Sequence, residues 1–344
     1  MNWLRVLAFA FIIVYHFIFE LEQKGNFDPE KGSLIKYSNS NLHIAIIGVS
    51  LFFMLSGAGL MLSSMRKWDI KDFYLRRFTK LLIPFYVVEL FTLIASLAIK
   101  REWLSYFPFM SKSKVIFNLL GMDGYFEQFF PTFSLHVGEW FLGALIMLYV
   151  LFPVFRLCME KNRYVTILVA TVYYVVVNYG NFFSTAPWTN VFVKAYDFIL
   201  GMFLILEIPK LLEKKKVSNL VNIVALLIII VGIILKPAIS MPTAIVNLMY
   251  AVVIFIYFFT ADNVRLKDTL PDVLVEKICG VSYEVFLVHH IIIYYIGDNL
   301  EGQIMGHKQI LALFVTEIII MIAMALLVRN IVKLINQKIF KKVQ

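Results

Sequence analysis

Residues 2–19 read NWLRVLAFAFIIVYHFIF, an apolar run that holds two basic side chains, Arg5 and His16. The two residues are eleven positions apart, which on an α-helix places them about 20° apart around the axis and about 16 Å apart along it. A helix face with two such groups is costly in lipid unless it points into protein. We therefore predict that this run is a membrane helix and that the rest of the chain covers its polar face.

The composition predicts an all-α polytopic membrane protein. Of the 344 residues, 60% are hydrophobic and 16% are charged, and no long polar block is present to form a soluble domain. These values exclude an ordinary soluble globular protein. The run at 2–19 leads into Glu20 and Glu22 rather than into the small residues of a signal-peptide cleavage site, so we expect a retained helix. The whole chain, 1–344, is predicted to form one transmembrane domain.

Ten stretches are apolar enough to cross a bilayer, which requires about 20 residues of helix. They lie at 2–19, 44–64, 79–99, 138–157, 163–181, 189–206, 218–236, 242–260, 278–296 and 309–331. The span at 189–206 is the weakest of the ten, because Lys194 and Asp197 interrupt it.

The distribution of positive charge predicts the orientation of these spans. With the N-terminus inside, 22 of the 32 basic residues flank the spans on the cytoplasmic side. This is the asymmetry that the positive-inside rule requires. An even number of spans also returns the C-terminus to the inner side, so we expect both termini to be cytoplasmic.

His16 is the first candidate for catalysis. Its imidazole titrates near neutral pH, so it can take a proton from a hydroxyl group as a general base. The alternative is a histidine that only hydrogen-bonds a neighbouring helix. Arg5 lies near the inner end of the same predicted helix, where it either serves the same site or simply extends its charge to the membrane surface.

A second candidate region is the basic stretch at the inner end of the predicted span 79–99. It holds Arg76, Arg77 and Lys80. Arg77 and Lys80 are three residues apart and share a helix face, so they could clamp the phosphates of a donor molecule. The same charges could act as topology determinants alone. The long loop at 100–137 is rich in aromatic residues, which we interpret as an interfacial anchor rather than a cover that stacks on sugars.

Two further stretches carry polar side chains beside apolar ones. Ser56 is followed by Gly57 and Gly59, and small residues of this kind favour close helix packing. Ser56 lacks the G-x-S-x-G surroundings of a nucleophile. Glu139, next to Trp140, could orient a histidine or bind a sugar hydroxyl, or it could be an acid at the membrane surface.

The ninth predicted span carries Tyr283 and the pair His289-His290. Paired histidines inside a span need partners. A metal site would require further ligands at a spacing such as H-x-x-x-H, and the neighbouring sequence has none, so we expect no metal. Cys158 and Cys279 fall at predicted inner helix ends without metal or redox spacing, so we expect free thiols.

Taken together, these stretches resemble the acyltransferase-3 family of bacterial multi-pass membrane enzymes, which O-acylate surface polysaccharides. The resemblance rests on six ordered pieces: Leu4-Arg5-x-x-Ala8 with Tyr15-His16-Phe17; Phe52-Phe53 through Ser56-Gly57; Arg77-x-x-Lys80 with Pro84; Glu139-Trp140-Phe141 with Tyr149 and Pro153; Phe198-x-x-Gly201; and Ser282-Tyr283 through His289-His290.

The resemblance implies a transfer reaction across the bacterial inner membrane. An acyl group, usually acetyl, would pass from cytoplasmic acyl-CoA to a hydroxyl of an extracytoplasmic glycan or lipid-linked sugar. The arginine-histidine motif of the family falls on Arg5 and His16, and its arginine pair falls on Arg77 and Lys80. Lysine keeps the charge of arginine but loses the two-pronged contact with a phosphate. No appended esterase-like domain is expected, so such a transferase, if required, would be a separate chain.

Two other functions fit parts of the sequence. A transporter or flippase of an anionic lipid-linked sugar would also use a basic inner vestibule and intramembrane histidines, although the sequence lacks the clear internal repeat common in transporters. A purely structural membrane protein would leave Arg5 and His16 unexplained. Within the transferase interpretation, direct transfer and a covalent acyl-enzyme both remain open. The bilayer, the donor and the acceptor are the expected partners, and nucleic acid is not.

Overall fold

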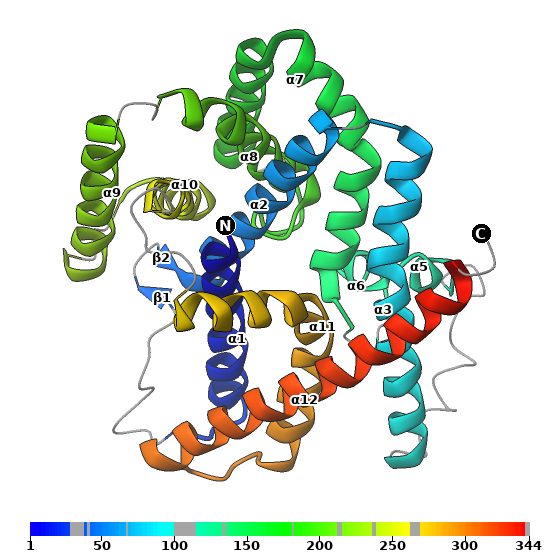
Figure 1. The fold of residues 1–344 in the computed structure, drawn as a ribbon. Helices are drawn as coiled ribbons and strands as arrows, with labels where there is room; N and C mark the ends of the chain where they lie inside the picture. Colours follow the sequence, from blue (N-terminus) through cyan, green and yellow to red (C-terminus); the bar gives the residue numbers. More distant parts are fainter. Residues whose placement is uncertain are drawn as a thin grey trace. The chain divides into compact units, whose positions relative to one another are not determined.

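The computed structural model describes residues 1–27, 38–39, 42–66, 68–99, 115–132, 135, 137–180, 182–211, 215–235, 239–261 and 269–340. Over these residues the chain is an all-α polytopic membrane protein (Figure 1). Its helices are α1 (Asn2–Gln23), α2 (Ile44–Arg66), α3 (Ile70–Ile99), α5 (Val115–Leu119), α6 (Asp123–Phe126), α7 (Glu139–Gly180), α8 (Val191–Leu211), α9 (Lys215–Leu235), α10 (Thr243–Ala261), α11 (Leu270–Asn299) and α12 (His307–Phe340). Two short antiparallel strands, β1 (Ser38–Asn39) and β2 (Leu42–His43), precede α2.

Each of the ten predicted spans has a helix in the described part of the chain. Eight helices there are long and apolar enough to cross a membrane. One of them, α7, bends at Asn162, where the backbone is non-helical (φ −160°, ψ 95°), and so contains the predicted spans 138–157 and 163–181. The remaining span, 189–206, is α8, a helix of 21 residues.

Three helices extend furthest beyond the spans that hydropathy predicted. Helix α3 begins at Ile70 rather than near residue 79, α11 begins at Leu270 rather than near 278, and α12 ends at Phe340 rather than near 331. Hydropathy marks only the section of a helix that lies in hydrocarbon, whereas the helical backbone continues into the polar surface layer. Arg76 and Arg77 therefore lie on α3 and not in a loop.

The chain divides into two compact units. The first contains Met1–Tyr15, Lys36–Ile70 and Leu148–Cys279. The second contains His16–Ile35, Lys71–Met147 and Gly280–Gln344. Helices α1, α7 and α11 each contribute residues to both units.

In the first unit, α2 and α8 approach each other closely. A side chain at Gly57 would collide with the backbone carbonyl of Phe198, and one at Gly201 would collide with the backbone of Met54. Only glycine permits backbones to come so near. This contact confirms the packing role predicted for the small residues of α2 at Gly57, whereas a Cβ added at Gly59 would meet no atom of another described element within 4 Å.

The two charges that weakened the α8 prediction pair with each other. Lys194 and Asp197 are 0% exposed, and their Nζ and Oδ2 atoms lie 2.8 Å apart. Lys194 also donates a hydrogen bond of 3.0 Å to the hydroxyl of Ser50 on α2. A buried ion is tolerated when a counter-ion and hydrogen bonds replace water, so α8 can cross the membrane despite both charges.

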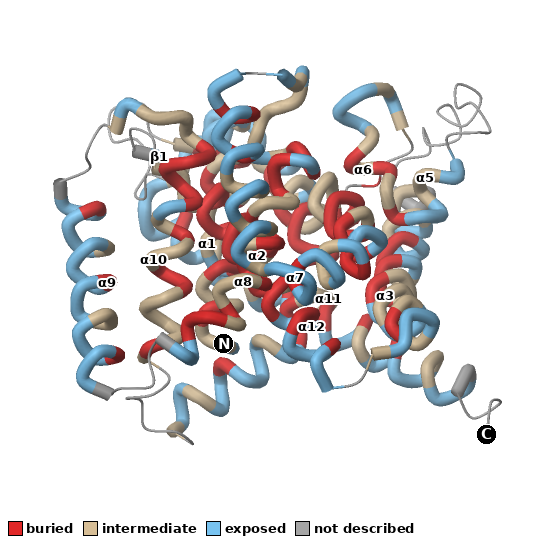
Figure 2. The backbone as a smooth tube through the Cα atoms, turned by 90° about the horizontal axis from the view of Figure 1, so that it is seen from above, coloured by how far each residue is buried: buried red, intermediate tan, exposed pale blue. Residues whose placement is uncertain are grey.

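Apolar side chains on the outer faces of the helices remain exposed, as expected of a protein in a bilayer. Figure 2 shows α9 largely in the colour of exposed residues. Its Leu220, Ile233 and Ile234 are each more than 60% exposed. In water such a surface would be an aggregation site, whereas in lipid it is the surface that contacts acyl chains.

In the second unit, a set of polar contacts holds the end of α1 to the end of α11. Lys24 lies 2.7 Å from a carboxylate oxygen of Asp298, and this hydrogen bond raises the pKa of Lys24 above its usual value. The buried amide of Asn26 donates to the carbonyls of Leu300 and Gln303. These contacts fix the register of α1 against α11. The two helices carry the histidines of the candidate site.

Candidate active site

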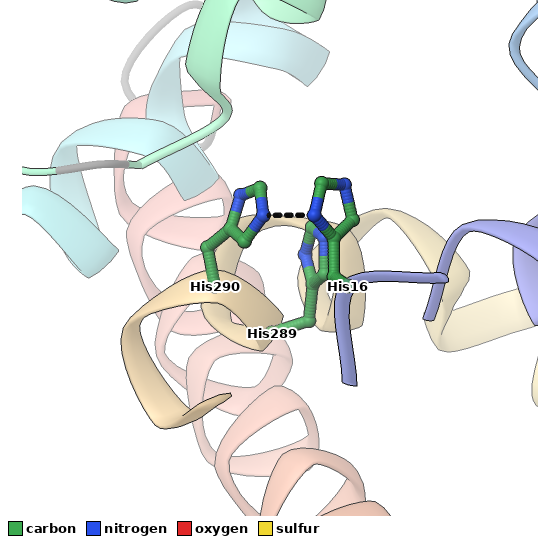
Figure 3. A group of neighbouring side chains, drawn as sticks. All are labelled: His16, His289 and His290. Atoms are coloured by element: carbon green, nitrogen blue, oxygen red, sulfur yellow. Dashed lines mark hydrogen bonds between the residues drawn. The ribbon is translucent and has the colours of Figure 1, made fainter. Parts of the chain in front are cut away.

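The residues 16–23 of α1 and the second half of α11 bring three histidines together in the second unit (Figure 3). Nε2 of His290 and Nδ1 of His16 lie 2.6 Å apart, a hydrogen-bond distance. The ring centre of His289 is 5.4 Å from that of His16 and 4.5 Å from that of His290. His289 and His290 are each 1% exposed, whereas His16 is partly exposed. His16 is therefore the member of the cluster that is open to a reactant.

Glu139, the first residue of α7, contacts the other side of the His290 ring. Its carboxylate pairs with Nδ1 of His290. Because Nε2 of the same ring faces His16, the three side chains form a continuous chain from Glu139 through His290 to His16. The sequence had left open whether Glu139 orients a histidine or lies at the membrane surface, and this contact supports the first interpretation.

The backbone at Glu139 is held in an unfavourable conformation. Its φ is +43°, and the preceding Gly138 also has a positive φ of +74°. The left-handed region costs a non-glycine residue about 1–2 kcal/mol. Gly124 on α6 lies so close to the main chain of Glu139 that any side chain there would overlap it. Strain of this kind is often found where a functional group must be aimed.

His289 is oriented by the backbone of its own helix. Its Nδ1 lies 2.6 Å from the carbonyl oxygen of Phe286. A carbonyl only accepts hydrogen bonds, so this contact places the proton of the ring on Nδ1 and leaves a lone pair on Nε2. Among the described residues, Nε2 of His289 has no hydrogen-bond partner, although it is buried.

Arg5 lies in the first unit, at the other end of α1. Its guanidinium donates a hydrogen bond of 3.1 Å to the sulfur of Cys279 on α11. The indole of Trp3 donates to a carboxylate oxygen of Asp272 at 2.8 Å, so α1 contacts the first half of α11 at two points. Cys158 and Cys279 are thiols and form no disulfide, as predicted. The contact between Cys279 and Arg5 was not predicted.

The basic residues of α3 have different neighbours in the second unit. Arg76 pairs with Asp72 one turn earlier on the same helix, at 2.8 Å. Glu284 of α11 interacts electrostatically with three cations, which are Lys80 of α3 and Arg329 and Lys333 of α12. In the sequence, Arg329 and Lys333 count only among the 22 cytoplasmic basic residues that predict the orientation. No local pattern could have shown that α12 brings them close to the residues around Lys80.

Three remaining candidate residues have contacts that support packing. The hydroxyl of Tyr283 donates to the backbone carbonyl of Leu81 at 2.8 Å and joins α11 to α3. The hydroxyl of Ser56 lies 2.9 Å from that of Tyr149, in the first unit. Trp140 is half-buried, and its ring lies nearly perpendicular to that of Phe141.

A family model described as an acyltransferase domain, of the acyltransferase-3 type, matches residues 1–329. The chain belongs to the acyltransferase-3 family. No curated protein and no solved structure matches the chain. Membership makes this protein a membrane acyltransferase, and it confirms the resemblance inferred from the ordered sequence pieces.

Proposed function

We propose that this acyltransferase moves an acyl group, acetyl by preference, from cytoplasmic acyl-CoA to a hydroxyl of an extracytoplasmic glycan or lipid-linked sugar. The observation that carries this proposal is the chain of contacts from Glu139 through His290 to His16. A carboxylate that orients a histidine is the arrangement used to prepare a general base in acyl transfer. We expect the protein to reside in the bacterial cytoplasmic membrane.

In the proposed mechanism, the chain of contacts sets the proton positions on His16. The carboxylate of Glu139 accepts the Nδ1 proton of His290, and Nε2 of His290 accepts the Nδ1 proton of His16. This leaves a lone pair on Nε2 of His16. That nitrogen removes the proton of the acceptor hydroxyl while the hydroxyl oxygen attacks the thioester carbonyl. The C–S bond then breaks, and the thiolate of CoA takes the proton from His16. In a covalent route, the same lone pair would attack the thioester first.

The proposed donor site uses the basic residues of α3 and α12. Lys80 and Arg329 share the neighbour Glu284, and Arg77 lies on α3 three residues before Lys80. Arginine and lysine are the side chains that bind phosphate groups, arginine through two parallel hydrogen bonds. We assign the phosphates of acyl-CoA to Arg77, Lys80 and Arg329. Arg76, which pairs with Asp72, and Arg5, which donates to the sulfur of Cys279, are further candidates for phosphate contact.

A purified-protein assay tests the proposed function. The full chain, reconstituted in vesicles with acetyl-CoA outside or inside, is expected to release CoA only when a glycan acceptor is present, and to form an ester on that acceptor. A transporter or flippase would instead move a lipid-linked sugar between leaflets without consuming acetyl-CoA. Transport without ester formation would therefore reject the proposal and favour the alternative.

The variant Glu139→Gln tests whether Glu139 positions the histidines. The amide removes the negative charge and the fixed proton arrangement, so kcat is expected to fall by about 10- to 100-fold while KM for acetyl-CoA changes little. Glu139→Asp should recover part of the loss. In the double variant with His16→Ala, Glu139→Gln should lower kcat no further, because the effects of substituting groups that act as one unit are not additive. Additive losses would show that Glu139 acts independently of His16.

The variant Arg329→Gln tests the donor site. Loss of a charge-assisted hydrogen bond to phosphate is expected to raise KM for acetyl-CoA by about 10-fold, with kcat nearly unchanged. Lys308→Gln is the matched control, because Lys308 lies on the first turn of the same helix, is exposed and is predicted to be extracytoplasmic. If Arg329→Gln and the unmodified protein have the same KM for acetyl-CoA, Arg329 does not bind the donor.

A further inference from the structure

The three histidines of the cluster have the geometry of a metal site. Each offers one ring nitrogen, and these nitrogens lie within 4.8 Å of one another. Nitrogens bound to one Zn²⁺ ion in tetrahedral geometry lie about 3.4 Å apart. The observed separation is 2.6 Å between His16 and His290, and no pair of these nitrogens is more than 4.8 Å apart. Small rotations of the three rings would therefore bring them around one ion.

The hydrogen bonds behind two of the rings are those expected of metal ligands. A histidine that binds a metal through one nitrogen usually donates its other N–H to a carboxylate or to a backbone carbonyl. His290 has the carboxylate of Glu139 in this position, and His289 has the carbonyl of Phe286. Each ring thus keeps a lone pair on Nε2, and both rings lie beside that of His16 (Figure 3).

The buried nitrogen of His289 is an independent indication of a ligand. His289 is 1% exposed, and its Nε2 has no hydrogen-bond partner among the described residues. Buried polar atoms are normally satisfied. The proton-transfer chain leaves this atom without a function, because it uses only Glu139, His290 and His16. A metal ion within the cluster would provide its missing partner.

We propose that His16, His289 and His290 bind one divalent transition-metal ion of the zinc type, with a fourth position open to water. Imidazole ligands favour Zn²⁺ and its transition-metal neighbours over Mg²⁺ and Ca²⁺, which prefer oxygen. From the sequence we expected no metal, because the adjacent pair on α11 lacks a metal-binding spacing, and the third ligand, His16, lies on α1.

Metal binding and the proposed proton transfer exclude each other at His16. This consequence rests on the proposed function. A metal at Nδ1 of His16 displaces the proton from that atom, and the neutral ring then carries its proton on Nε2. Nε2 no longer has the lone pair that would accept a proton from the acceptor hydroxyl. The ion is therefore an inhibitor that locks the histidine cluster in an inactive form.

The test is a Co²⁺ and Zn²⁺ titration of the full chain, purified in detergent through a tag without histidines and treated with chelator. We expect one Co²⁺ per chain, with the intense visible absorption of low-coordinate Co²⁺, and displacement of that ion by Zn²⁺. His289→Gln should weaken binding at least 10-fold, and Glu139→Gln by about 10- to 100-fold. His307→Gln is the matched control, because His307 is exposed at the start of α12, and it should bind as the unmodified protein does.

The possible results separate this inference from the proposed function. Absence of Co²⁺ binding by the unmodified protein, or unchanged binding by a monodisperse His289→Gln protein, would overturn the metal site. Acyl transfer that still depends on His16 would leave the proposed function intact in that case. If the protein binds metal, Zn²⁺ should inhibit acyl transfer reversibly, and chelator should restore the activity. Activation of the chelated protein by Zn²⁺ would overturn the inhibitory role.

Discussion

The variant His16→Ala is expected to lose acyl transfer, with kcat lowered by about 10²- to 10⁴-fold. This is the usual contribution of a positioned general base. His16 is the partly exposed end of the chain of contacts that begins at Glu139, and removal of its ring leaves that chain without its partly exposed member. The measurement is CoA release by purified protein, together with mass spectrometry of surface glycans from cells that carry the variant or the unmodified gene.

A loss of activity is informative only if the variant inserts and folds. His16→Ala removes a ring that is partly exposed, so normal membrane levels and a monodisperse elution profile are expected. His307→Ala is the matched control, since it removes an exposed histidine at the start of α12 and should retain full activity. Near-normal glycan acylation by His16→Ala would reject His16 as the base and would also rule out an acyl-histidine intermediate at this position.

The fold was largely predictable because a bilayer imposes a simple length rule on helices. Each predicted span corresponds to helix in the described chain, and even the doubtful 189–206 is α8. The doubt arose from two charges in one span, and the pairing of Lys194 with Asp197 explains how the span accommodates them. Hydropathy could not predict the polar turns at the start of α3, because these turns lie outside the hydrocarbon.

The candidate site was predictable in its residues but not in its connections. His16 was identified because a titratable side chain is costly within an apolar run. Its contact with His290 joins positions 274 residues apart, and nothing local in either helix determines which residue meets which. The same holds for Arg329, whose proximity to Glu284 depends on how α12 packs. Residue types thus indicated the candidate residues, and tertiary packing determined which of them lie together.

The variant Lys194→Met is expected to destabilise the protein by about 3–5 kcal/mol. Removal of one member of a buried ion pair leaves the other as an uncompensated charge in an apolar interior. Asp197 is 0% exposed, and its second carboxylate oxygen has no partner within the described residues, so no other group is positioned to replace the lysine. The measurement is equilibrium unfolding of the purified protein in mixed micelles, followed by tryptophan fluorescence.

The double variant Lys194→Met with Asp197→Leu should recover most of that stability, because a buried ion pair replaced by apolar side chains of similar size is often neutral or stabilising. Helix α8 also provides a matched control. Lys210 and Glu207 have the same three-residue separation, but Lys210 is 55% exposed. Lys210→Met should therefore cost no more than about 1 kcal/mol. A similar loss for Lys194→Met and Lys210→Met would show that burial does not determine the strength of these pairs. A double variant as unstable as Lys194→Met would show that the hydrogen bond from Lys194 to Ser50, rather than the charge on Asp197, holds α8 to α2.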